Sequence, residues 1–123
     1  MGNVKIRPAT VKDVQAVYGH PPKRSMKAYA ATLDGKTIGV AGLYYFPDHL
    51  LAFSNVLPEY RHLKYGIAKG TLKVLEMLED VRVPVYAAAD PEIKDSGDFL
   101  LRCGFEYYTL NDHGEIYVWQ PKH

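Results

Sequence analysis

The feature of the sequence that most constrains the fold is a strand, a helix and a second strand in direct succession. Residues 50–57, LLAFSNVL, are nearly all apolar, which is typical of a strand covered on both faces. Residues 66–80 then place apolar side chains such as Val74 and Leu78 at helical spacing, and residues 83–89, VPVYAAA, form a second apolar run. Because such a succession forms a parallel crossover unit, we expect an α/β fold with a parallel strand pair.

Signals ahead of this unit extend the sheet. Residues 3–7 alternate polar and apolar side chains and predict a first strand. Thr10 is the expected N-cap of a short helix, which Gly19 ends. Two runs rich in β-forming residues flank Asp34-Gly35, a dipeptide that favours a tight hairpin turn. We therefore expect a strand, a helix and a hairpin before the crossover unit.

The last part of the chain predicts one more helix and a closing hairpin. Residues 95–103 have the pattern of a short helix with Phe99, Leu100 and Cys103 facing the core. The runs FEYYTL and EIYVW flank a polar turn and predict the hairpin. The order β-α-β-β-β-α-β-α-β-β predicts an α/β (α+β) fold with a mixed sheet of about seven strands and about three helices. We expect residues 1–123 to form a single domain, since this length suits one hydrophobic core.

The composition argues against several classes of protein. The net charge of +1 suggests neither nucleic acid nor an anionic membrane as a partner. The single cysteine, Cys103, excludes an intrachain disulfide, and its place at a helix C-terminus favours a structural thiol. The histidines show no ligand spacing, so no metal is expected. No stretch approaches about 18 apolar residues and no signal peptide is recognised, so we expect a cytoplasmic protein.

The stretch PEYRHLKYGIAKG, residues 58–70, joins the apolar strand to the helix that follows it. A helix N-terminus after a parallel strand exposes backbone N–H groups and the positive end of the helix dipole, a combination that binds phosphate. Gly66 and Ala68 allow a ligand to approach the backbone closely. Two interpretations stay open: an anion site, or a solvated basic loop ahead of an ordinary helix. Positive charge surrounds this point at Arg61, His62, Lys64 and Lys69.

Four segments, in this order, resemble elements of the GNAT N-acetyltransferase superfamily. They are VKIRPATVKDVQAV, DGKTIGVAGLYY, NVLPEYR with GIAKGTLKVLE, and FLLRCGFEYY, and together they cover nearly the whole chain. The resemblance implies a twisted mixed sheet that splays between the fourth and fifth strands, with acetyl-CoA as the cosubstrate in the opening. It also implies that the pantetheine pairs with the backbone of residues 53–57 and that the pyrophosphate rests on residues 61–69.

The resemblance also assigns the binding residues and shows where this chain differs. Leu63 stands where the family has Gln or Arg ahead of its first glycine. The short segment PPKRSM, residues 21–26, replaces the family's second helix, which forms a wall of the acceptor site. The acceptor is therefore expected to be large and docked on an open surface, or bound with a partner's help. The implied cofactor-binding residues are Phe53, Val56, Leu57, Arg61, His62, Lys64, Tyr65, Gly66, Ile67, Ala68, Lys69, Ser96 and Phe99.

The chemistry that the resemblance implies needs a neutral amine and a hydrogen-bond donor for the thioester carbonyl. The donor in the family is a backbone N–H of the fourth strand, here Val56 or Leu57. Family members often carry a Glu on that strand, but residues 50–57 contain none. Ser54 and Asn55 are the polar side chains of the strand, and we expect them to order a water that relays the proton.

The acid that protonates the leaving thiolate has no direct counterpart. The family's tyrosine on the late helix corresponds to Leu100 here. Tyr107 is the candidate in its place, with Tyr108 beside it on the next strand and Tyr44 and Tyr45 as a similar pair on the third strand. One of Tyr107 and Tyr108 is expected to face the core. Asp48 and His49 lie in a turn, where a structural role is favoured over a base.

The sequence thus predicts an acetyl-CoA-dependent N-acetyltransferase that acts by direct transfer on an amine of a small molecule or a protein. The alternative is a non-catalytic GNAT-fold module that binds CoA or a protein partner, for instance a viral accessory protein. The missing Glu and Tyr favour this alternative, since a fold alone does not establish an activity. A homodimer is a further prediction, through the aromatic last strand EIYVW at the sheet edge.

Overall fold

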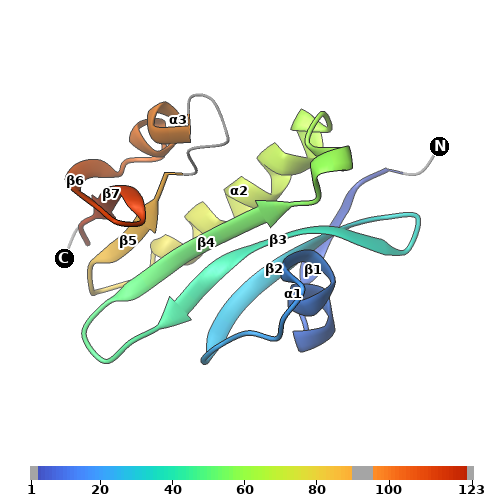
Figure 1. The fold of residues 1–123 in the computed structure, drawn as a ribbon, viewed down its shortest axis with the longest axis horizontal. Coiled ribbons are helices and arrows are strands. Elements are labelled where there is room, and N and C mark those ends of the chain that lie inside the picture. The colour runs from blue at the N-terminus through green and yellow to red at the C-terminus, as the bar shows by residue number, and fades with distance from the viewer. Residues whose placement is uncertain (1–2, 90–95, 122–123) are drawn as a thin grey trace.

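The computed structural model describes residues 3–89 and 96–121. In this part of the chain, seven strands form one sheet in the order β1-β2-β3-β4-β5-β7-β6 (Figure 1). The predicted order of strands and helices is confirmed, with one short 3-10 turn, η1, added after β4. The elements are β1 (Lys5–Pro8), α1 (Val11–Tyr18), β2 (Met26–Leu33), β3 (Lys36–Tyr45), β4 (Leu50–Val56), η1 (Pro58–Tyr60), α2 (Lys64–Leu78), β5 (Val85–Ala88), α3 (Ser96–Arg102), β6 (Glu106–Asn111) and β7 (Gly114–Trp119).

The sheet is mixed, as the crossover unit predicts. β4 and β5 pair in parallel and are joined through α2, whereas the other neighbouring strands of the sheet pair antiparallel. Helices cover both faces (Figure 1). Leu43 of β3 belongs to the larger core cluster with Leu78 of α2, while Val40 of β3 packs with Val17 of α1. Because residues three apart on a strand point to opposite faces, α1 and α2 lie on opposite sides of the sheet.

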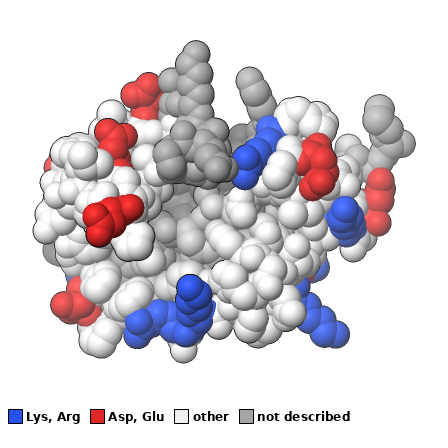
Figure 2. Space-filling view, in the orientation of Figure 1, with Lys and Arg blue, Asp and Glu red and all other residues white. Residues whose placement is uncertain are grey.

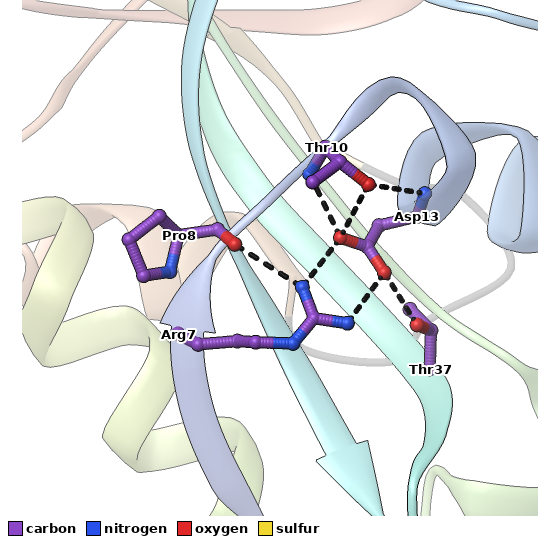
Figure 3. Close-up of polar contacts among 5 residues, drawn as sticks. All are labelled: Arg7, Pro8, Thr10, Asp13 and Thr37. Atoms are coloured by element: carbon purple, nitrogen blue, oxygen red, sulfur yellow. Dashed lines mark hydrogen bonds and ion pairs between the residues drawn. The ribbon is translucent and has the colours of Figure 1, made fainter.

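A buried carboxylate joins the first strand, the first helix and the third strand (Figure 3). Asp13, which is 4% exposed, accepts from Arg7 Nη1 and Nη2 at 2.6 and 2.9 Å and from Thr37 Oγ1 at 2.6 Å. The same carboxylate closes a capping box with Thr10, whose backbone N–H donates to it at 2.7 Å. These hydrogen bonds, that from Arg7 first, hold the pKa of the Asp13 carboxyl far below its usual range.

One expectation for the fourth strand is wrong. The apolar run at residues 50–57 predicts burial on both faces, yet Leu50 is the one buried residue of β4, and Ser54 is exposed. The reason is that β5 pairs with β4 only as far as Leu51, so the rest of the strand has no neighbour on that side among the described strands. The apolar content of residues 50–57 does not indicate where β5 diverges from β4.

Two further expectations concern aromatic side chains near the C-terminus, and both are wrong. Phe99 does not face the core but is 40% exposed, because the short helix α3 packs on the core through Leu100 and Cys103 instead. Neither Tyr107 nor Tyr108 faces the core: they are 54% and 58% exposed. A register shift between Tyr107 and Thr109 interrupts the alternation of β6 at this point.

The expected edge strand is also wrong. β7, which contains the run EIYVW, lies between β5 and β6 inside the sheet. The edges of the sheet are β1 and β6, so a second copy of the chain that pairs at an edge would meet one of these strands rather than β7. None of the helices in the described part of the chain has the length and apolar character that a membrane span requires. The cytoplasmic location stays a prediction.

Candidate functional site

The candidate site begins where the two parallel strands part. β4 and β5 are joined by two residue pairs, Leu50 with Val85 and Leu51 with Tyr86. β4 then continues to Val56 and β5 to Ala88 without further pairing in the described part of the chain. The expected splay between the fourth and fifth strands is therefore confirmed, and it opens toward the carboxyl ends of both strands.

The backbone of β4 turns polar groups toward this opening. The N–H of Leu57 donates to the carbonyl of Ile38 at 2.8 Å, on the β3 side of the strand. Since backbone groups alternate along an antiparallel pair, the N–H and C=O of Ser54 and Val56 point to the other side, away from β3. The backbone N–H groups of Val56 and Leu57 are the two predicted donors to the thioester carbonyl. The N–H of Leu57 is already bonded to Ile38, whereas the N–H of Val56 points into the splay.

Arg61 lies at the rim of the opening. Its Nε donates to the carbonyl oxygen of Val56 at 3.1 Å, and its Nη2 lies 3.4 Å from Oδ1 of Asn55. The turn η1, which begins at Pro58, brings the chain back so that this guanidinium reaches the end of β4. Asn55, a predicted water-ordering residue, is therefore a partner of Arg61.

The helix after this turn starts earlier than expected. α2 begins at Lys64 rather than at residue 66, and its N-cap residue Leu63 makes no side-chain capping bond. The first backbone N–H groups of a helix lack intrahelical partners, so this end can bind an anion. The side chains of residues 64–68, five of the predicted binding residues, lie outside the described part of the structure.

The remaining predicted residues are spread over both sides of the sheet. Phe53 packs with the α1 cluster and stacks on Tyr44 with ring centroids 4.3 Å apart, so its side chain faces away from α2. His62 is exposed, Lys69 is half-buried on α2, and Ser96 is half-buried at the start of α3. Tyr107 touches the ring of Tyr117 edge-on at 5.7 Å.

Tyr117 is a tyrosine that the sequence reasoning missed. It is 6% exposed, and a Cβ added at Gly97 of α3 would collide with its phenol oxygen. Burial, followed by the neighbouring carboxylates Glu115 and Asp98, raises the pKa of this phenol. The alternation of β7 could have indicated a buried tyrosine, but nothing in the sequence indicated that α3 packs directly on it.

A row of aromatic rings lies at the closed end of the splay, where β4 and β5 still pair, on the face of the sheet away from the larger core cluster. Phe46 and His49 stack with centroids 4.5 Å apart and planes at 12°, and the row continues from His49 to Tyr86 at 5.5 Å and from Tyr86 to Tyr108 at 5.4 Å. The guanidinium of Arg24 sits 3.7 Å from the centroid of Phe46 at the other end. This row of Phe46, His49, Tyr86 and Tyr108, here called the aromatic row, was not foreseen as a unit.

Charge and metal chemistry give no stronger candidate. Figure 2 shows acidic and basic side chains mostly around the periphery of the face it draws. Among residues 3–89 and 96–121, no group of three or more His, Cys, Asp or Glu side chains is arranged to hold a metal ion. The splay and the aromatic row are therefore the features on which a function can be built.

The sheet order, the crossover and the splay define the fold of the GNAT N-acetyltransferases. The ribosomal-protein-S18-alanine N-acetyltransferase from Escherichia coli matches with a TM-score of 0.71 at 16% identity, over 98% of this chain and 96% of that one. An N-acetyltransferase from Staphylococcus aureus Mu50 matches with a TM-score of 0.71 at 15% identity, over 98% and 99%. The PaiA N-acetyltransferase from Thermoplasma acidophilum, in complex with coenzyme A, matches at 0.69 with 13% identity, over 96% and 99%. The sequence itself matches no protein-family model and no curated protein.

Proposed function

We propose that the chain is an acetyl-CoA-dependent N-acetyltransferase, located in the cytoplasm, that acetylates an amine of a small molecule or protein by direct transfer. The observation that carries this proposal is the early divergence of β4 from β5, which turns the backbone of Ser54 and Val56 toward an opening. The same fold occurs in the two named N-acetyltransferases and in PaiA, whose structure contains coenzyme A. These likenesses support the fold, and the opening supports the ligand.

In this proposal the cosubstrate lies alongside β4 after Leu51, where β5 no longer pairs with it. The pantetheine pairs with the free side of β4 at Ser54, whose N–H and C=O both face the opening. The pyrophosphate lies at the start of α2, where unpaired N–H groups and the helix dipole favour an anion. Arg61, anchored on the Val56 carbonyl, adds positive charge to the same rim.

The opening also suggests how the reaction is assisted. A backbone N–H directed into the opening can donate to the thioester carbonyl as it gains negative charge, and Val56 is the donor we propose. Such a donor needs no particular side chain, so it does not depend on the family's missing Glu. Binding both substrates side by side converts a bimolecular reaction into an intramolecular one, which supplies much of the remaining acceleration.

Calorimetric titration of acetyl-CoA and CoA into the full chain tests the cosubstrate. Gly66→Glu places a carboxylate in the first turn of α2, where it competes with the pyrophosphate, and is expected to weaken binding at least about tenfold. Leu72→Glu is the matched control, because Leu72 is 59% exposed on the same helix and the substitution adds the same charge farther along. No binding by the unaltered chain at millimolar ligand would overturn the proposal and leave an interaction module.

The role of Arg61 is tested in the same titration. Arg61→Ala is expected to weaken acetyl-CoA binding about fivefold to twentyfold, since one charge-assisted contact to phosphate is removed. Arg82→Ala is the matched control: Arg82 is exposed and follows the far end of α2. Equal affinities for the two variants would remove Arg61 from the binding site.

A further inference from the structure

Phe53, in the middle of β4, has one face of its ring stacked and the other turned to the splay. Its ring centroid lies 4.3 Å from that of Tyr44 on β3, with the two planes 23° apart. Tyr18, at the end of α1, meets the same ring edge-on at 6.1 Å. Because Tyr44 comes from the β3 side of β4, the second face of the Phe53 ring is directed to the other side, where β5 has stopped pairing. The half-burial of Phe53 agrees with one free face.

A small residue stands across the opening from this ring. Leu50 of β4 pairs with Val85 of β5, so Phe53, three residues farther along, is level with Ala88. Ala88 is exposed, and it points away from the larger core cluster, to which the neighbouring Ala87 belongs. Both Phe53 and Ala88 therefore face the side of the sheet that carries α1. Since the two strands have parted at this level, a flat group has room between these side chains.

The surroundings of this ring are apolar or basic. Burial raises the pKa of the Tyr44 phenol, so the stacked partner of Phe53 is uncharged at neutral pH. The backbone of Lys23 hydrogen-bonds to this phenol, and the next residue, Arg24, places its guanidinium 3.7 Å from the ring centroid of Phe46. A second ammonium group on the acceptor would be repelled by these basic side chains. An uncharged aromatic ring gains instead from stacking on Phe53.

The distance from Phe53 to the reacting centre suits a short arm between ring and amine. Val56, whose N–H is the proposed donor to the thioester carbonyl, follows Phe53 by three residues, which span about 10 Å of strand. An amine nitrogen attacks from about 3 Å. A chain of two or three carbons places the nitrogen about 5–7 Å from the centre of its ring, which covers the rest. One carbon is too short for both contacts.

We propose that the acceptor is a primary arylalkylamine, whose ring stacks on the free face of Phe53 opposite Ala88. The proposal rests on the proposed N-acetyltransferase function and names its substrate class. The acceptor enters on the side of α1, whereas α2, which holds the pyrophosphate in that function, covers the opposite side. The neutral amine forms the C–N bond as the C–S bond breaks, and the proton that the nitrogen loses ends on the CoA sulfur.

The first test is acetyl transfer by the full chain at saturating acetyl-CoA. The probe amines are benzylamine, 2-phenylethylamine, 3-phenylpropylamine, n-butylamine, 1,4-diaminobutane and a lysine peptide. We expect kcat/KM to be at least about tenfold higher for 2-phenylethylamine or 3-phenylpropylamine than for n-butylamine, because a phenyl ring is buried. Benzylamine is expected to fall below both. Faster acetylation of 1,4-diaminobutane or of the lysine peptide than of every arylalkylamine would overturn the proposal and leave the enzyme intact.

Phe53→Leu tests the stacking. The substitution keeps an apolar side chain against the α1 cluster and removes the flat ring. It is expected to raise KM for 2-phenylethylamine about threefold to tenfold, with values for n-butylamine and the Kd of acetyl-CoA nearly unchanged. Tyr45→Leu is the matched control, since it removes a 42% exposed ring at the end of β3, on the other face of the sheet. Equal KM values in the two variants would remove Phe53 from the acceptor site.

Ala88→Phe tests the space opposite Phe53. Because Ala88 is exposed, the larger side chain is compatible with the fold, and it fills the place of the acceptor ring. We expect kcat/KM for 2-phenylethylamine to fall at least about tenfold, while n-butylamine, which needs no such space, is acetylated as before. An unchanged preference for arylalkylamines in this variant would contradict the proposed position of the ring.

Calorimetry separates the two ways in which these tests can fail. Failure of the unaltered chain to bind acetyl-CoA would refute the proposed function itself. If acetyl-CoA binds and no probe amine is acetylated, 2-phenylethylamine is titrated into the full chain saturated with CoA. Binding that is weakened in Ala88→Phe would support the acceptor site, and no binding at millimolar amine would overturn it.

Discussion

The first and second parts of the sheet treat their polar groups differently. Around β1, α1 and β3, the carboxylate of Asp13 receives hydrogen bonds from Arg7, Thr10 and Thr37, all within the fold. Around the β4–β5 junction, the backbone of Ser54 and Val56 faces an opening. Asp48, close to this junction, forms a hydrogen bond with the imidazole of the neighbouring His49 and does not link distant elements of the fold. Closed networks fix structure, whereas polar groups left facing an opening are where a ligand can bind.

The largest expected effect breaks the closed network. Asp13→Ala is expected to reduce the free energy of unfolding by about 3 kcal/mol, because it leaves the partly exposed guanidinium and the Thr10 N–H without their acceptor. Urea denaturation measures the loss. Asp112→Ala, at an exposed turn, is the control and should change stability by less than about 0.5 kcal/mol. Similar losses for both variants would mean that the network does not stabilise the first part of the sheet.

A smaller effect is expected on the side of the sheet that carries α3. Gly97→Ala adds a Cβ that collides with the Tyr117 phenol oxygen, so the helix must shift, at about 1–2 kcal/mol of unfolding free energy. Tyr117→Phe removes that oxygen, so the double variant should recover part of the loss relative to Tyr117→Phe alone. Additive losses in such a double-mutant cycle would show that α3 does not rest on Tyr117.

The pH dependence of the closed network is expected to be smaller still. Because the folded pKa of Asp13 is depressed, its stabilisation is complete well above the unfolded pKa of about 3.9 and is lost progressively as the pH falls from there to the folded pKa. Between pH 7 and 3.5 the loss is about 0.7 kcal/mol, from protonation of the unfolded chain. Denaturation of the unaltered chain and of Asp13→Asn at both pH values measures it, and the stability difference between them should shrink by that amount. An unchanged difference would contradict the depressed pKa.

The smallest effect is expected at the outer edge. Leu110 of β6 is 66% exposed, so Leu110→Lys should change the free energy of unfolding by less than about 0.5 kcal/mol. Sedimentation of both forms checks the oligomeric state. A shift from dimer to monomer in the variant would show that β6 pairs with a second copy, the homodimer that the sequence suggested at a different strand.

What the sequence could predict follows from local physical signals. The element order, the Thr10 cap and the parallel crossover were all readable, because turn residues and apolar periodicity are local. The low burial of β4 could not be predicted from the sequence, since it depends on where the pairing between β4 and β5 ends. The exposure of Phe99 and the placement of β7 inside the sheet likewise depend on contacts between distant segments. The sequence placed Asp48 and His49 together in a turn, but it indicated neither their hydrogen bond nor the contact of the imidazole with Tyr86 of β5.

The two residue pairs that join β4 to β5 have a thermodynamic consequence. A strand that ends its pairing early is an inner edge of the sheet, and any linear molecule that pairs with it completes the hydrogen-bond ladder. Such a molecule binds only the folded chain, so its binding energy becomes folding energy: at a concentration of 100 Kd it adds about 2.7 kcal/mol to the free energy of unfolding. Under the proposed function, the melting temperature of this protein therefore rises with the concentration of the cosubstrate around it.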